Sequence, residues 1–313
     1  MKVATVVGAG RGVADYGPAL ATWEVLLAGS PTVLRRRLGT ELRKMRQSND
    51  MTAAQVAKAL GWSESKVSRI ESGKSPLSDQ DAQLLLARYG VEDPQDVRQF
   101  ISLARRSRQN GWWHSYGEAL PDWLKPYLGF ESDAASIWTY QTELVPGLFQ
   151  TEGYARAVIG SMNPELSADE VEVRASARVQ RQEILTNEDP PRVWAIVNEA
   201  VIRRVVGSND VMSEQLQVLA DVAESLPTVT VQVLPFDAGS HVAMGYSFSY
   251  LSFEDVPGSI AYSEGPTSAT YLDKDSDLTR HAEIFQRLVA SSERPEKSIE
   301  LIRTVAEDYR HAG

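Results

Sequence analysis

Cysteine is absent from the 313 residues of this chain. Its absence excludes disulfides, thiolate nucleophiles and cysteine-ligated zinc sites. The sequence also lacks the apolar run of roughly 18 residues that a membrane-spanning helix needs. The short apolar stretch at residues 3–7 is too short for the core of a signal peptide. From these absences we expect a cytoplasmic protein.

Histidine is scarce, and the common catalytic motifs are missing. No two of the four histidines stand at a spacing typical of metal ligands. There is no G-x-S-x-G motif and no defensible Ser-His-Asp order. We therefore expect no enzyme activity, no metal and no cofactor.

Two stretches are similar to ligand-binding motifs but depart from them. Residues 6–17 contain G-x-G-x-G, whereas a dinucleotide site needs G-x-G-x-x-G between a strand and a helix. Residues 273–284 begin as D-x-D-x-D, but Leu278 and Ile284 replace the glycine and glutamate of a calcium loop. We interpret the second stretch as a polar helix-capping loop. A nucleotide-dependent enzyme is therefore the weakest of the alternative functions, because only the incomplete glycine motif supports it.

Charge divides the chain into parts. The formal net charge is −10, yet residues 30–110 hold 15 Lys and Arg against 9 Asp and Glu. Residues 111–313 hold 15 basic against 31 acidic side chains. We expect two domains with these bounds, because basic charge gathers where phosphate contacts would need it. Residues 1–29 lack an amphipathic period, and we expect them to form a disordered leader. The sequence leaves open whether this leader is translated at all.

The basic segment has the pattern of a helical domain. Apolar residues recur every three or four positions from Val33 to Met45, as on one face of a helix. Ser30 and Pro31 favour a helix start just before this stretch. Four further apolar-periodic segments follow good N-cap residues, namely Thr52, Ser63, Ser78 and Asp93. The sequence therefore predicts five helices and no strand between residues 30 and 110.

The second and third of these helices have the spacing of a helix-turn-helix. Ala57 is a small residue where two steeply crossing helices would touch, and Gly61 can turn the chain. Val67 and Ile70 would then face inward from the next helix. This predicts a recognition helix at about residues 63–72. An ordinary helical hairpin with a glycine loop is the alternative.

Two groups of motifs carry a family resemblance. Residues 30–110, with VSRIESGK, resemble the lambda-repressor-like (XRE) DNA-binding domain, which is an all-α five-helix fold. The stretches YQTELVPGLFQTEGYARAVI, VWAIVNEAVIRRVVG and VTVQVLPFDAGSH resemble the C-terminal domain of actinobacterial WhiJ-like, antitoxin-like regulators. The resemblance implies transcriptional regulation and leaves open the operator, the target genes and the sign of the regulation.

The resemblance also implies roles for residues of the recognition helix. Those expected to contact base edges in the major groove are Glu64, Ser65, Lys66, Ser68 and Arg69. Those expected to contact phosphates are Ser63, Lys74, Arg43 and Lys44. Many relatives have glutamine at the start of the second helix to hold a phosphate, whereas this chain has Ala53 there.

Beyond residue 110 helical and strand patterns alternate. The expected strands are residues 192–198, 228–234, 246–253 and 258–263. The expected helices are residues 168–186, 211–225, 276–291 and 296–309. We predict an α+β domain with a mostly antiparallel sheet. Its clustered aromatic residues could form core, an effector pocket or a dimer interface: Trp112, Trp113, Trp123, Trp138, Tyr140 and Phe149.

The main hypothesis is a homodimeric regulator that binds double-stranded operator DNA. Its C-terminal domain would dimerise and sense a small-molecule effector or a partner. The alternative is an antitoxin-like interaction module, in which the acidic domain binds a small partner protein and DNA binding is secondary.

Overall fold

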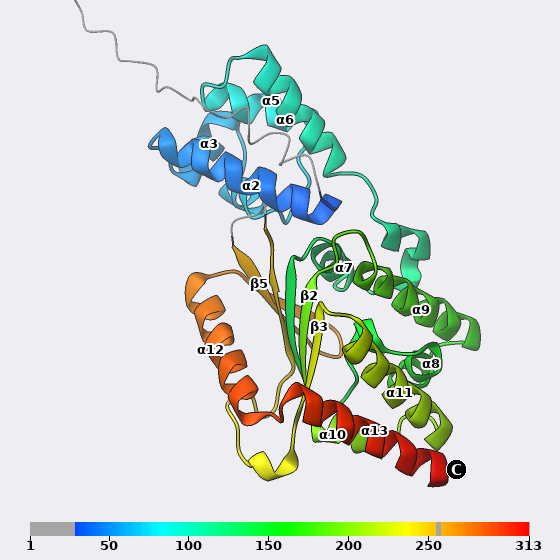
Figure 1. Cartoon of the computed structure of the whole chain (residues 1–313). Coiled ribbons are helices and arrows are strands. Elements are labelled where there is room, and N and C mark those ends of the chain that lie inside the picture. The colour runs from blue at the N-terminus through cyan, green and yellow to red at the C-terminus, as the bar shows by residue number, and fades with distance from the viewer. Residues whose placement is uncertain (1–28, 255–257, 313) are drawn as a thin grey trace, which may run out of the picture.

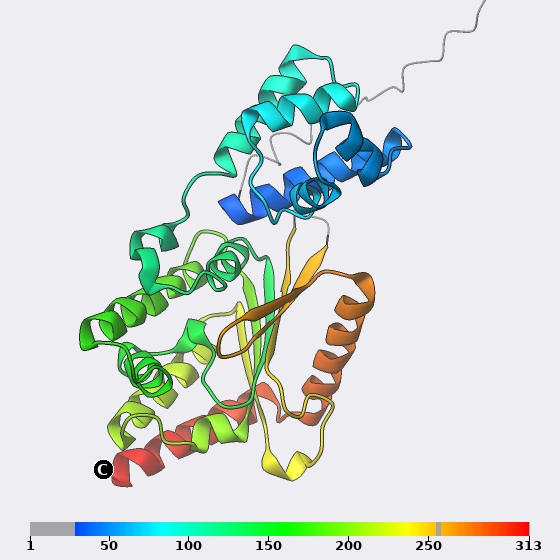
Figure 2. The ribbon, with the colours of Figure 1, turned by 180° about the vertical axis from the view of Figure 1, so that it is seen from behind.

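The computed structural model describes residues 29–254 and 258–312. An all-helical unit sits at one end of a larger unit built around a sheet (Figure 1 and, from behind, Figure 2). All but the last residue of the expected leader lies outside the described residues.

Five helices form the N-terminal unit, as the sequence predicts. They are α2 (Pro31–Ser48), α3 (Ala53–Leu60), α4 (Glu64–Glu71), α5 (Asp79–Arg88) and α6 (Pro94–Arg106). Each predicted N-cap side chain accepts a backbone N–H of its own helix, namely Ser30, Thr52, Ser63, Ser78 and Asp93. The capping box of Thr52 and Gln55 is complete. The helices enclose one apolar core that includes Leu38, Val67 and Phe100.

A six-stranded mixed sheet forms the centre of the second unit. Its strand order is β3-β2-β1-β4-β5-β6. The strands are β1 (Ser136–Gln141), β2 (Arg192–Asn198), β3 (Val229–Leu234), β4 (Phe248–Ser252), β5 (Ser259–Glu264) and β6 (Ala269–Leu272). Three strand pairs are antiparallel, in line with the expected mostly antiparallel sheet, but β1, β2 and β3 run parallel. Helices connect these three strands, and such crossovers allow parallel pairing.

Helices cover both faces of this sheet. The α-helices are α7 (Lys125–Ser132), α8 (Glu152–Met162), α9 (Ala168–Gln180), α10 (Glu199–Arg203), α11 (Asn209–Ser225), α12 (Asp275–Ser291) and α13 (Pro295–Ala312). Short 3₁₀ segments are η1 (Trp112–Ala119), η2 (Gly147–Phe149), η3 (Arg181–Leu185) and η4 (Phe236–Ala238). In both views α12 covers one face, and α7, α8, α9, α11 and α13 lie on the other side (Figures 1 and 2).

Several elements of this unit differ from the sequence expectation. The four expected strands are present, but the central strand β1 and the edge strand β6 are additional. Helices α7, α8 and α10 are additional too, and the expected helix at residues 168–186 divides into α9 and η3. The acidic stretch at residue 273 leads into α12. Asp275 and Asp277 occupy the first turn of this helix, where their negative charges interact favourably with the helix dipole.

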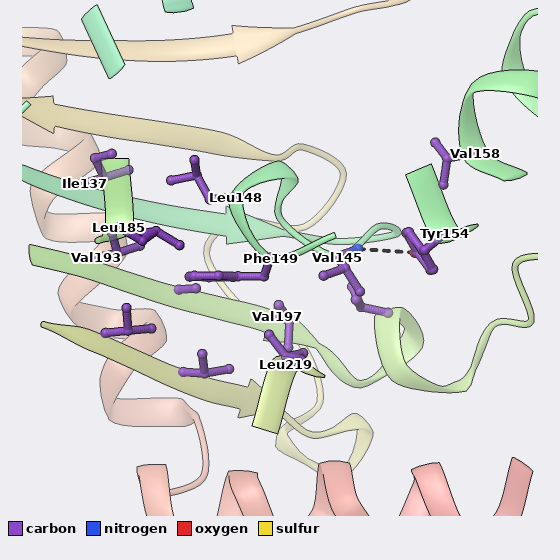
Figure 3. Close-up of a cluster of buried hydrophobic side chains, with 14 of the residues drawn as sticks. Ile137, Val145, Leu148, Phe149, Tyr154, Val158, Leu185, Val193, Val197 and Leu219 are labelled. Carbon is purple, nitrogen blue, oxygen red and sulfur yellow. Dashed lines mark hydrogen bonds between the residues drawn. The ribbon is translucent and has the colours of Figure 1, made fainter. Parts of the chain in front are cut away.

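The aromatic residues after position 110 go mainly into two cores. Trp113 and Phe149 are buried in the larger core, part of which Figure 3 shows between the sheet and the helices. There the Tyr154 hydroxyl accepts the Val145 N–H at 3.3 Å. On the opposite face of the sheet, Tyr140 is buried beneath α12 and Trp138 stacks on Phe285, with 5.2 Å between ring centroids.

The two units touch through α2, which packs against α7 and the β4–β5 hairpin. The Ser30 hydroxyl donates to the Gly129 carbonyl at 2.8 Å, and the Ser30 N–H donates to Asp133. Gly129 packs so closely on Thr32 that an added Cβ would lie 2.3 Å from the threonine hydroxyl oxygen. Further along α2, Arg36 donates to the Ser259 carbonyl at 3.3 Å. The N-terminal unit is therefore docked on the second unit by one helix.

Within the described ranges, none of the helices combines the length and apolar character that crossing a bilayer requires.

Candidate nucleic-acid interface

Helices α3 and α4 form the predicted helix-turn-helix. Gly61 ends α3 in the left-handed region at φ 69°, a conformation that glycine adopts without a Cβ penalty. The Trp62 N–H closes the turn on the Ala57 carbonyl at 2.8 Å. Ala57 is buried at the junction, and Val67 and Ile70 are buried on α4. The four spacing constraints read from the sequence are thus met by one compact motif.

The N-terminus of α4 is capped by Ser63. Its hydroxyl oxygen accepts the Lys66 N–H at 3.2 Å and lies 3.0 Å from the Ser65 hydroxyl. Ser63 and Ser65 are exposed. A capping hydroxyl still has a donor to offer, so Ser63 can hold the helix end and donate to a phosphate oxygen.

Four of the five predicted base-contacting residues have exposed side chains, namely Glu64, Ser65, Ser68 and Arg69. Lys66 differs, because its Nζ lies 3.0 Å from an Asp81 carboxylate oxygen and 3.7 Å from the centre of the Trp62 ring. These contacts tie α4 to the start of α5. A base contact by Lys66 would have to replace them.

The predicted phosphate-contacting residues do not all lie together. Arg43 is exposed one helical turn after Gly39, the α2 residue that packs on α4, so it lies on the same side of α2. Lys44 lies round the helix from that side and pairs with Glu41 at 2.7 Å. Lys74 is exposed just after α4, where its backbone N–H closes the helix end on the Arg69 carbonyl.

An ion pair that the sequence analysis missed fixes the far end of α4. Arg46 Nε lies 2.6 Å from Glu71 Oε1, and Nη2 lies 2.9 Å from Oε2. Arg46 also donates to the Met51 carbonyl at 2.7 Å. The hydrogen bonds that Arg46 donates to the Glu71 carboxylate raise the pKa of Arg46 above its ordinary value. The pair clamps α4 to the end of α2, and its 25-residue separation gives no local signal in the sequence.

Two glycines allow α2 and α4 to approach closely. A Cβ on Gly39 would lie 2.5 Å from the Glu71 carbonyl oxygen and 2.6 Å from that of Ile70. Gly73 has φ 69° and lies against the backbone of Arg36. The orientation of α4 on the domain therefore depends on backbone contact with α2.

Two protein families match the chain. The family described as "Helix-turn-helix domain" matches residues 37–100, which include α3 and α4. The family described as "Domain of unknown function (DUF5753)" matches residues 124–304, more than half of the chain. No significant match was found among curated proteins or among solved structures. The helix-turn-helix match suggests DNA binding, and the role of the second domain is unknown.

Proposed function

We propose that this chain, which belongs to the DUF5753 family, is a sequence-specific DNA-binding transcriptional regulator of the XRE, WhiJ-like kind. The observation that carries the proposal is the helix-turn-helix, with the exposed first turn and outer face of α4. In this proposal the N-terminal part of α4 enters the major groove of operator DNA. The proposal assigns the chain no catalytic activity.

Arg69 is the main candidate for reading a base. It is exposed and makes no side-chain ion pair within the described part of the chain. A guanidinium can donate two hydrogen bonds to guanine O6 and N7. Lys74, beyond the helix end, would meet only phosphate oxygens. The two residues should therefore affect binding in different ways.

The test begins with DNA fragments selected from a genomic library by the purified protein and then sequenced. Arg69→Ala should cost about 1–3 kcal/mol on the selected site and relax preference at one base pair of each half-site. Lys74→Ala should weaken selected and scrambled DNA alike and lower the salt slope by about one per contacted half-site. Arg98→Ala, at an exposed position of α6, is the control and should change neither.

Two results would contradict this placement of α4. One is an equal loss on selected and scrambled DNA for Arg69→Ala. The other is an altered base preference for Lys74→Ala.

The proposal includes a homodimer, because one recognition helix makes few contacts and two-fold symmetry doubles them on a palindromic site. Mass measurements on the free protein and on its DNA complex, at micromolar concentration, should show two copies. A single copy on the selected DNA would remove the dimer from the proposal.

A second candidate function is the antitoxin-like one, in which the acidic domain binds a small partner protein. It is favoured by three exposed apolar side chains in the segment between β3 and β4, namely Phe236, Val242 and Met244. Residues 111–313 carry 31 acidic against 15 basic side chains, so the matching partner would be basic. Purification from its own host should recover such a partner with the native chain, and lose it with Phe236→Ser and Met244→Ser combined.

A further inference from the structure

A cavity of about 460 Å³ lies in the second unit between α7, α9 and the strands β1, β4 and β5. Its apolar walls include Trp123, Tyr127, Leu148 and Phe149. The last two belong to the core cluster drawn in Figure 3. Small-molecule sites in proteins typically enclose about 300–1,000 Å³ and combine apolar walls with a few polar groups. The cavity has the size and the apolar lining of such a site.

Three arginines line the same cavity, and one of them is fully paired. Arg181 donates to both oxygens of Glu131, at 2.7 and 2.8 Å. Glu131 is buried, and its charge raises the pKa of Arg181 against the opposing effect of burial. This pair is a closed structural unit that leaves no charge for a ligand to neutralise.

Arg174 and Arg178 stand one turn apart on α9 without such a partner. Neither forms an ion pair with any carboxylate of the described residues. Arg178 donates to the Gln150 side-chain oxygen at 3.0 Å. Arg174 has its Nε buried with no hydrogen-bond partner among the described residues. Two cationic side chains thus share one cavity wall without a directly paired carboxylate: Glu264 and Glu131 act on the charge of Arg178 only from beyond ion-pair distance, as Glu170 does on Arg174.

The electrostatics of the cavity favour an incoming anion. Burial, and then the charge of Arg181, lower the pKa of Arg178 to about 10, which still leaves it protonated at neutral pH. Two other acidic side chains line the cavity. Glu143 is paired with Arg204 at 2.8 Å, and Glu264 is exposed and accepts the Tyr262 hydroxyl at 3.0 Å. A desolvated guanidinium without a directly paired carboxylate is unfavourable, and its planar fork suits an incoming carboxylate.

We propose that this cavity binds a small organic acid, with its carboxylate on Arg174 and Arg178 and an aromatic or branched body against Trp123 and Phe149. The acid is the effector of the regulator, so this inference rests on the proposed DNA-binding function.

Helix α7 connects the cavity to the DNA-binding unit. Tyr127 and Glu131 of α7 line the cavity. On the same helix, Gly129 packs on Thr32 and accepts a hydrogen bond from Ser30. A ligand that shifts α7 acts directly on the start of α2, the helix on which α4 is clamped. Occupancy of the cavity is thereby coupled to the position of the recognition helix.

The first experiment measures binding of phenylacetate and of its neutral isostere phenylacetamide to the full chain, by ligand-observed NMR and calorimetry. Phenylacetate should bind with a Kd on the order of 1 mM, as expected for a ligand of about ten heavy atoms. Phenylacetamide should bind at least about tenfold more weakly, because it lacks the charge. Equal binding of the two, or no binding of either at millimolar concentration, would overturn the proposal.

Substitutions test the arginines. Arg178→Met keeps the apolar stem and should abolish the preference for the acid over the amide. Arg156→Met is the control: Arg156 is exposed on α8, pairs with Glu152 and Glu172, and should leave the preference unchanged. A preference that survives Arg178→Met would contradict the assigned site.

Thermal unfolding separates a ligand site from a structural role. Arg178→Met should leave the unfolding temperature unchanged or raised, because it removes an unpaired charge. Arg181→Met should lower it, because it strands the buried carboxylate of Glu131. An equal loss for both variants would mean that Arg178 is structural, which is contrary to the proposal.

DNA affinity at saturating phenylacetate completes the test. The Kd for the selected DNA should change several-fold in the native chain and not in Arg178→Met, since coupling between sites is reciprocal. An unchanged Kd would refute the effector role. Charge-dependent phenylacetate binding by a chain that binds no DNA would instead refute the proposed function and leave the ligand site standing.

Discussion

The ion pair between Arg46 and Glu71 can be tested by a substitution that changes charge with little change in shape. Glu71→Gln removes the carboxylate charge and leaves the guanidinium in place. The side chains of Arg46 and Glu71 are only 12% and 8% exposed, so solvent compensates poorly. Breaking a buried pair from one side costs about 3–5 kcal/mol. We expect about 3 kcal/mol, the lower end, because Arg46 keeps its bond to the Met51 carbonyl.

The control for this substitution lies on α2, the helix that carries Arg46. Glu41→Gln breaks the ion pair between Glu41 and Lys44, whose side chains are 30% exposed for Glu41 and 54% exposed for Lys44. Exposed pairs contribute at most about 1 kcal/mol. The double variant Arg46→Met with Glu71→Leu should recover most of the loss, because it leaves no unpaired buried charge.

Urea unfolding followed by circular dichroism and tryptophan fluorescence gives the free energy of unfolding for each variant. The transition that involves the N-terminal unit should move to lower urea for Glu71→Gln and hardly move for Glu41→Gln. Similar losses for the two single variants would show that the pair does not clamp α4 to α2. A double variant no more stable than Glu71→Gln would contradict the desolvation argument.

Two further outcomes follow from the structure. Gly39→Ala should destabilise the chain by about 1–3 kcal/mol and weaken DNA binding, because the added methyl group meets the carbonyl oxygens of α4. Gly160→Ala in α8 should instead stabilise the chain by up to about 1 kcal/mol in the same unfolding assay, because the added methyl group has no neighbouring atom within 4 Å. Burial lowers the pKa of His241 in the folded chain below its ordinary value of 6.5. The burial of neutral His241 therefore contributes stability that is fully present above pH 6.5, where the side chain is neutral in both the folded and the unfolded chain. This contribution is lost as the pH falls from 6.5 through the lowered pKa of the folded state. Thermal unfolding of His241→Gln should show a smaller loss on acidification than the native chain, and identical pH profiles would count against this assignment.

Sequence alone was sufficient where structure is decided within a few residues. The N-caps at Thr52, Ser63 and Asp93 and the glycine turn at Gly61 were predicted because each rests on contacts no more than about one helical turn away. Strand β2 was predicted with its observed bounds, Arg192–Asn198, from its apolar and β-branched character. The sequence pattern did not predict strand β1, because its aromatic residues Trp138 and Tyr140 were interpreted with the neighbouring aromatic cluster, for which core was the favoured interpretation.

Only the tertiary structure decided which charged side chains of the candidate sites find a partner. Lys66 has the spacing of a base-reading residue, but folding brings Asp81, fifteen residues away, to its ammonium group. Arg178 and Arg181 look alike in the sequence, yet only Arg181 meets Glu131, fifty residues before it. Local propensity acts within a turn of helix, whereas ion pairing and desolvation depend on which distant segments the sheet and helices place together. The sequence by itself therefore determined the helix-turn-helix, and only the tertiary structure decided which of its charges are already paired.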